Sequence, residues 1–134
     1  MKTSEDASEF SPRRSRSHRD LIVWRKAIDL AVEAYKLAAA LPEDECSVLR
    51  ERMYRASVLV SSNIAEGHDL SAKAFLRHLD IAQGSLAQLV TMIELAKRLG
   101  YFDESIEAKA MLLADEVGRL LWTLMEKLGA RRWD

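Results

Sequence analysis

The most restrictive feature of this 134-residue chain is the spacing of its apolar residues, which recur every three or four positions through four long segments. That spacing places the apolar side chains along one face of an α-helix. No segment of the sequence shows the alternation of apolar and polar residues that is typical of a half-buried strand. We therefore expect an all-α protein with a single core, which a chain of this length can stabilise.

Proline and glycine residues divide the pattern into separate helices. The first helix is predicted to run from Asp20, its expected N-cap, to Leu41, because Pro42 disfavours helical geometry in the residue before it. The second is predicted over residues 43–66, and Gly67 is expected to adopt the left-handed conformation that closes many helices.

The third and fourth helices have apolar residues close to heptad spacing. The third is predicted to start at Ser71 as N-cap and to end at Gly100, and the fourth to start at Asp103 and end at Gly129. Helices joined by short connections reverse direction each time, so residues 20–129 are predicted to form an antiparallel up-down-up-down four-helix bundle. The residues expected to face the core are Trp24, Ala27, Ile28, Ala31, Tyr35 and Ala38; Leu49, Met53, Ala56, Val60 and Ile64; Phe75, Leu79, Ala82, Leu86, Leu89, Ile93 and Ala96; and Ile106, Ala110, Leu113, Val117, Leu120, Leu124 and Leu128.

The third and fourth helices also carry a second set of apolar residues that one core-facing seam would not bury. Wide apolar coverage on a small bundle favours self-association, although some of these side chains could instead widen the core. The set comprises Leu76, Ile81, Val90 and Met92, and Met111, Leu112, Leu121, Trp122 and Met125.

The flanks of the predicted bundle differ from it in charge. Residues 1–19 hold five Lys/Arg and three Asp/Glu (+2), residues 20–128 hold 13 and 17 (−4), and residues 129–134 hold two and one (+1). We expect a flexible basic arm over residues 1–19 and a short tail over residues 130–134. The sequence has no apolar membrane span and no signal-peptide core, and Cys46 is its only cysteine, so we expect a cytoplasmic protein with no membrane partner.

Motifs that carry chemistry are absent from the sequence. None of the 12 glutamates has a histidine three residues later, which is the spacing of carboxylate metal bundles. The glycines match no phosphate-binding loop, and no serine follows the pattern of a hydrolase nucleophile. His68 and Asp69 are interpreted as a solvated helix end. We therefore predict no catalytic residue, cofactor or metal, and a protein that is not an enzyme.

The segment of residues 61–67, Ser-Ser-Asn-Ile-Ala-Glu-Gly, is polar where the helical pattern predicts burial. Serine and asparagine disfavour a helix interior unless hydrogen bonds hold them. We interpret the segment as a polar lock that sets the register between the second and third helices, and a ligand site is the alternative. The predicted lock consists of Ser62, Asn63, Glu66 and Gly67 with Gly84, Ser85 and Gln88.

At these residues the chain resembles the four-helix bundle proteins encoded within intervening sequences of bacterial large-subunit ribosomal RNA genes. The resemblance covers roughly residues 20–128, and the Ser-Asn-Ile-Ala-Glu-Gly string is its most specific part. Gln88 and Val90 depart from it, since the family usually has acidic residues there. The matching residues are Asp20-Leu21, Val23-Trp24, Arg55-Ala56-Ser57, the string of residues 62–67, Phe75, Leu79, Ile81-Ala82, Gly84-Ser85 and Leu99-Gly100-Tyr101.

The resemblance implies a left-handed antiparallel bundle that assembles as a homo-oligomeric ring, commonly a pentamer, with no established enzymatic activity. A related branch is similar to the accessory proteins of diversity-generating retroelements, which work with a reverse transcriptase and RNA. Nucleic acid is therefore a candidate partner by resemblance.

Two functional hypotheses follow. In the first, the protein binds structured RNA or an RNA-associated protein through basic residues, although the −4 charge of residues 20–128 opposes phosphate binding. In the second, it is a protein-interaction scaffold that does not bind nucleic acid. A small-ligand pocket under Trp24 and Tyr35 has little support, because aromatic residues at helical spacing generally belong to a core. The candidate nucleic-acid contacts are Arg13, Arg14, Arg16, Arg19, Arg50, Arg52, Arg55, Lys73, Arg77, Lys97 and Arg98.

Overall fold

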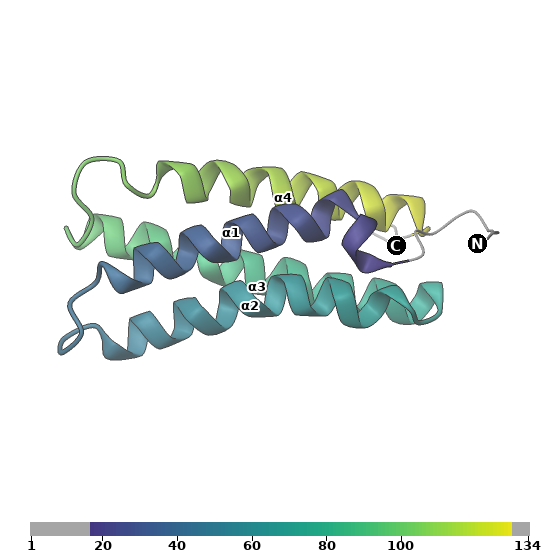
Figure 1. Cartoon of the computed structure of the whole chain (residues 1–134), viewed down its shortest axis with the longest axis horizontal. Helices are drawn as coiled ribbons and strands as arrows, with labels where there is room; N and C mark the ends of the chain where they lie inside the picture. The colour runs from purple at the N-terminus through teal and green to yellow at the C-terminus, as the bar shows by residue number, and fades with distance from the viewer. Residues whose placement is uncertain (1–16, 130–134) are drawn as a thin grey trace.

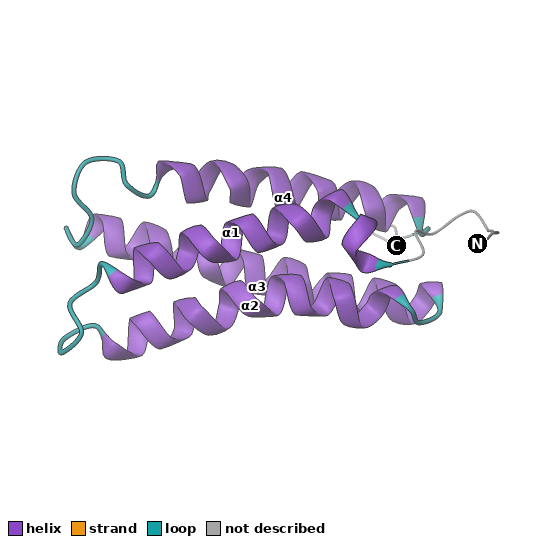
Figure 2. Cartoon of the chain, viewed as in Figure 1, coloured by secondary structure: helices purple, strands orange, loops and turns teal. Residues whose placement is uncertain are grey.

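The structure, a computed structural model, describes residues 17–129, and within that range it contains helices and no strand (Figures 1 and 2). The predicted all-α four-helix fold is confirmed. The predicted tail and most of the predicted arm, residues 1–16, lie outside the described residues. In chain order the elements are the 3-10 helix η1 (His18–Asp20) and the α-helices α1 (Ile22–Ala39), α2 (Ser47–His68), α3 (Ala72–Arg98) and α4 (Ala108–Lys127).

The four α-helices lie side by side along the long axis of the molecule, and consecutive helices run in opposite directions. The α1–α2 and α3–α4 connections lie at one end and the α2–α3 connection at the other (Figure 1). Cross-helix ion pairs agree with this arrangement, because Lys26 of α1 pairs with Glu116 of α4, whereas the later Glu33 pairs with the earlier Lys109. Each helix packs against two neighbours, and the α2–α3 pair packs most extensively.

The core is continuous through the bundle. All seven residues predicted to face inward in the third helix are buried. In α1 the predicted inward residues Ile28 and Tyr35 are instead 36% and 44% exposed, and Leu30 and Leu37 are buried in their place. The buried face of α1 is therefore rotated relative to the predicted stripe, since α1 packs against both α2 and α4.

The core-facing seam of α4 also differs from the prediction. Its buried residues are Ala110, Ala114, Val117, Leu121 and Met125. The predicted seam residues Leu113, Leu120, Leu124 and Leu128 are half-buried and pack at its border, and Ile106 is exposed before the helix begins. Two apolar stripes lie next to each other on this helix, and heptad spacing alone does not decide which stripe faces the core.

Two helix starts are later than predicted. The second helix begins at Ser47 rather than at residue 43, because Cys46 N–H bonds to the carbonyl of Pro42 in a separate turn. The fourth begins at Ala108, since the left-handed backbone of Glu104 (φ 56°) interrupts any helix from Asp103.

The first helix also starts without the predicted side-chain cap. Asp20 belongs to η1, and Leu21, which precedes α1, makes no side-chain cap hydrogen bond. Three predicted ends are confirmed: Ser71 caps α3 by accepting from Ala74 N–H, and Gly100 and Gly129 adopt positive φ after α3 and α4. The first helix ends at Ala39 rather than at Leu41, and the second continues to His68. None of the described helices combines the length and the apolar character needed to cross a membrane.

Replacing Leu121 by alanine tests the corrected core. Leu121 is fully buried, so Leu121→Ala should lower the free energy of unfolding by about 2 to 5 kcal/mol through lost apolar burial and the resulting cavity. Leu112 is 73% exposed on the same helix, and the control Leu112→Ala should change it by less than about 0.5 kcal/mol. Urea unfolding measures both, and equal effects would contradict the assigned burial.

Candidate functional site

A polar contact joins α2 and α3 near their shared connection. Asn63 is buried on α2, where its Nδ2 donates to the Leu59 carbonyl at 2.8 Å. Its Oδ1 lies 3.0 Å from Nδ1 of His78 on α3, and the same ring nitrogen is 3.7 Å from Glu66 Oε1. The amide nitrogen of Asn63 thus hydrogen-bonds within α2, and its amide oxygen contacts α3.

His78 was missing from the predicted lock, although the sequence contains a signal for it. The two helices form a hairpin whose connection lies at residues 69–71, so residues equidistant from that turn face each other. Asn63 and His78 are nearly equidistant from it. Gly84 and Gln88 lie farther along α3, both are exposed, and the structure does not bring them to Asn63. Ser85 is buried and Ser62 is half-buried.

Gly67 has a different role from the one predicted. It lies inside α2, which continues to His68, and it does not take the left-handed closing conformation. A Cβ at Gly67 would lie 2.7 Å from Cβ of His78 and 2.9 Å from Cδ1 of Phe75. Gly67 therefore permits the close approach that was predicted at Gly84, where an added Cβ would meet nothing within 4 Å.

His68 is also placed differently from the prediction. Its side chain is buried, with Nδ1 3.0 Å from Asp69 Oδ1 and the ring edge-on to Phe75. The predicted solvated helix end is therefore wrong for His68, because α3 folds back over it. No cluster of three or more His, Cys, Asp or Glu side chains within residues 17–129 could hold a metal ion.

Several candidate nucleic-acid contacts are engaged with protein groups. The guanidinium of Arg19 lies 5.5 Å from the Trp24 ring centroid, as in a cation–π contact. Ion pairs join Arg50 to Glu43 (3.8 Å), Lys97 to Glu107 (3.1 Å) and Arg98 to Glu94 (2.8 Å). Arg13, Arg14 and Arg16 lie outside the described residues.

Two of these pairs shift pKa values. A hydrogen bond from its own backbone N–H, followed by the Lys97 ammonium, lowers the pKa of Glu107. A hydrogen bond to the Tyr54 hydroxyl raises the pKa of Arg50. Lys97 and Arg50 are thus engaged with protein groups, although the Lys97 side chain remains exposed.

The remaining candidates, Arg52 and Arg55 on α2 and Lys73 and Arg77 on α3, are exposed. None of them makes an ion pair with an acidic residue of the described part of the chain. These residues flank the junction of α2 and α3, and we call them the α2–α3 basic edge.

A hollow of about 540 Å³ lies within the α2–α3 basic edge, and we call it the α2–α3 groove. Arg52 and Arg55 line it together with Gln88, a residue that the sequence assigned to the lock. Its full lining is Arg52, Arg55, Ala56, Leu59, Ala87, Gln88, Thr91 and Met92. The groove therefore combines two cations, uncharged polar groups and an apolar floor.

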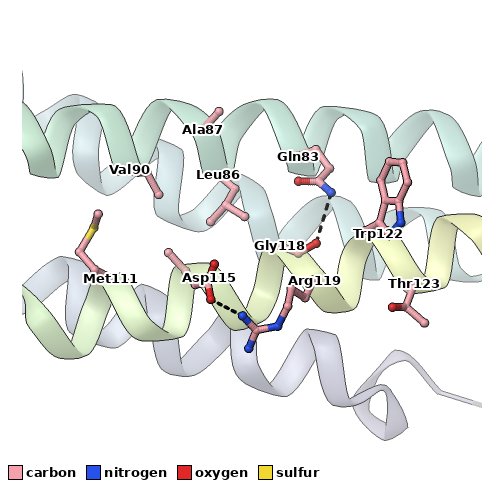
Figure 3. A pocket seen from close by; sticks show the side chains of 11 residues that line it. Gln83, Leu86, Ala87, Val90, Met111, Asp115, Gly118, Arg119, Trp122 and Thr123 are labelled. Carbon is pink, nitrogen blue, oxygen red and sulfur yellow. Dashed lines mark hydrogen bonds and ion pairs between the residues drawn. The ribbon is translucent and has the colours of Figure 1, made fainter. Parts of the chain in front are cut away.

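A second hollow, of about 690 Å³, lies between α3 and α4, and we call it the α3–α4 groove (Figure 3). Val90 and Leu86 of α3 and Met111 and Trp122 of α4 give it an apolar lining. Gln83 Nε2 donates to the Gly118 carbonyl across the two helices at 3.5 Å. These apolar side chains include part of the second set seen in the sequence, whereas Leu121 and Met125 of that set are core residues.

The aromatic residues of the first helix contact protein groups. Tyr35 packs against Tyr54 with ring centroids 4.4 Å apart, and Trp24 contacts the ring of His18 at 4.9 Å. Trp24 packs against the core, as predicted, whereas Tyr35 is 44% exposed and contacts Tyr54 at the surface.

Comparison with known proteins identifies a matching family and a similar solved structure. The family model described as 23S rRNA-intervening sequence protein matches residues 19–123. The crystal structure of a Bacteroides thetaiotaomicron protein of unknown function, from the S23 ribosomal protein family, is similar with a TM-score of 0.72 and 21% identity. That similarity covers 78% of this chain and 99% of the other, and it supports the fold. No curated protein matches the chain.

Matched alanine substitutions at Gly67 and Gly84 test the close contact. Gly67→Ala should lower the free energy of unfolding by about 1 to 2 kcal/mol. Overpacking destabilises by about 1 to 3 kcal/mol, and the helix preference of alanine over glycine offsets only about 1 kcal/mol of this. Gly84→Ala should raise it by up to about 1 kcal/mol, since only the helix preference acts there. Thermal unfolding measures both, and stabilisation by Gly67→Ala would contradict the contact.

Proposed function

Because the chain belongs to the family of 23S rRNA-intervening sequence proteins, we propose that it is a non-enzymatic cytoplasmic bundle that assembles into a homo-oligomeric ring, a pentamer, and binds structured RNA or a ribonucleoprotein. The observation that carries the RNA part is the distribution of ion pairs. Seven Lys and Arg residues within residues 17–129 have no acidic partner there, and four of them form the α2–α3 basic edge; the other three are Arg19, Arg25 and Lys127.

The ion pairs explain how a bundle of net charge −4 can still bind an anion. Glu33 pairs with Lys36 and Lys109, and Glu116 pairs with Lys26. These acids of α1 and α4 are therefore balanced on the side of the bundle away from the α2–α3 junction.

Acidic residues also lie on α2, on α3 and in the connection between them, and two of these carboxylates face histidine rings, which carry a compensating charge only when protonated. Glu66 lies 3.7 Å from the His78 ring and Asp69 lies 3.0 Å from the His68 ring. Glu51 and Asp80 are exposed on the same helices and reduce the local positive charge. We therefore expect RNA binding of moderate affinity that weakens as salt rises, as phosphate contacts do.

Self-assembly is supported by the α3–α4 groove. Its apolar side chains Val90, Met111 and Trp122 are half-buried in the isolated chain, and a second copy would cover them. In a ring the α2–α3 basic edge would be repeated on every copy. Repetition strengthens the binding of a partner long enough to reach several copies at once.

The alternative function is a protein-interaction scaffold without nucleic acid. It is favoured by a further hollow of about 410 Å³ at the end of α2 and α3, which is lined in part by Val48, Leu95 and Leu99. These three side chains are 65%, 49% and 59% exposed. Exposed apolar side chains around a hollow are typical of a protein-docking surface.

Neutralising the α2–α3 basic edge tests the RNA proposal. The variant Lys73→Gln/Arg77→Gln should weaken binding to a stem-loop RNA and reduce the slope of log affinity against log salt by about 1.4 to 1.8, for two lost phosphate contacts. Fluorescence anisotropy at several salt concentrations measures this.

The control Lys36→Gln/Lys127→Gln makes the same charge change on α1 and α4. It should leave the slope nearly unchanged. Equal weakening of RNA binding by both variants would show that binding depends only on net charge. Absence of RNA binding by the unmodified protein would favour the scaffold function.

Replacing Val90 by glutamine tests the site of self-association. Val90→Gln places a polar group in the α3–α4 groove and should lower the molar mass measured by light scattering toward that of one chain. Leu112→Gln makes the same change at an exposed α4 position that is not part of the groove lining, and it should leave the assembly intact. A monomeric unmodified protein would overturn the proposed ring.

A further inference from the structure

We propose that the α2–α3 groove holds one unpaired nucleotide of the bound RNA, with its phosphate at Arg52 and Arg55 and its base on the apolar floor. This inference rests on the proposed RNA binding. It adds the kind of RNA recognised, namely RNA that presents a base outside a duplex.

The groove owes its depth to small side chains at the helix junction. Ala56 of α2 and Ala87 of α3 line it on opposite sides, where larger apolar residues would fill the space between the helices. The hollow of about 540 Å³ lies within the range of about 300 to 1,000 Å³ that is usual for small-molecule sites. A single nucleotide is an occupant of suitable size.

The charge of the groove suits a phosphate. Arg52 and Arg55 are one helical turn apart and project from the same side of α2. Neither makes an ion pair with an acidic residue within residues 17–129, in contrast to Arg50, which pairs with Glu43. Guanidinium groups bind phosphate oxygens with two parallel hydrogen bonds, so an adjacent pair can hold one phosphate group.

The floor and rim of the groove suit a base. Leu59 and Met92 are half-buried and apolar, and a methionine thioether makes favourable contacts with aromatic rings. Gln88 can both donate and accept at a base edge. Thr91 Oγ1 donates to the Ala87 carbonyl at 2.8 Å, which leaves its oxygen lone pairs to accept from a base N–H.

A paired base could not reach this site. In an A-form duplex the bases are stacked inside, and proteins read mainly the phosphates, the 2′-hydroxyls and the overall shape. Unpaired bases in loops and bulges can be turned outward into a protein hollow. The combination of apolar floor, amide and paired arginines therefore favours an RNA loop over a regular helix.

The test compares the full chain's affinity for two labelled RNAs with the same number of phosphates, a stem-loop and a blunt duplex. We expect the stem-loop to bind about tenfold more tightly, because a base seated against Leu59 and Met92 removes apolar surface from water. The variant Arg52→Gln/Arg55→Gln should reduce the salt slope for the stem-loop by about 0.7, the value for one phosphate of a single strand.

A matched pair of uncharged substitutions separates the groove from general electrostatics. Thr91→Leu adds bulk to the α2–α3 groove and should abolish the preference for the stem-loop. Thr123→Leu makes the same change at an exposed position lining the α3–α4 groove and should preserve the preference. Circular dichroism confirms that each variant is folded before the affinities are compared.

Three outcomes would overturn the inference. Equal affinity of the unmodified protein for stem-loop and duplex would reject the nucleotide site while leaving RNA binding in place. Binding of neither RNA would reject the proposed function itself. A labelled glutamate-rich peptide could also bind, with binding that Thr91→Leu prevents and RNA does not compete away. That result would identify the groove as a protein-docking site.

Discussion

The rest of the structure depends on the close contact between α2 and α3 at Gly67. A side chain there would collide with the Cβ atom of His78, which lies next to the backbone and cannot easily move away. The contact therefore sets both the separation and the register of the two helices, and it brings Asn63 opposite His78. The α2–α3 groove lies farther along the same junction, so its width follows from the same register.

In the proposed RNA binding, the distribution of ion pairs matters more than the net charge. The bundle is slightly acidic as a whole, but Glu33 of α1 and Glu116 of α4 are paired with Lys109 and Lys26. The cations of the α2–α3 basic edge, which have no acidic partner within residues 17–129, remain on the opposite side. Attraction over the distance of a phosphate contact depends on these local charges, because salt screens charges beyond about 8 to 10 Å.

The proposed assembly and the proposed RNA binding use different sides of the bundle, with α3 contributing to both. Val90 faces the α3–α4 groove, while Gln88 and Met92 face the α2–α3 groove. The two grooves meet at Ala87, which lines both of them, so a second copy in the α3–α4 groove would lie beside the α2–α3 groove. This division explains why α3 carries apolar residues beyond its core-facing seam: the helix separates two surfaces as well as filling the core.

Local patterns in the sequence determined the helices, the ends at Ser71, Gly100 and Gly129, and the buried face of α3, because helical periodicity and end residues of this kind act over a few residues. The resemblance at residues 62–67 led to the correct family. The sequence also identified Asn63 and Gly67 as special positions, but it paired them with the wrong part of α3.

Only the tertiary structure decided which residues met across helices. It selected His78 rather than Gly84 as the partner of Asn63, and Leu121 rather than Leu120 for the core. It also separated Lys97, which is paired with Glu107, from Arg52, which has no acidic partner in the described chain. The physical reason is that helix rotation and register depend on all the contacts between helices at once, whereas each local pattern permits several of them.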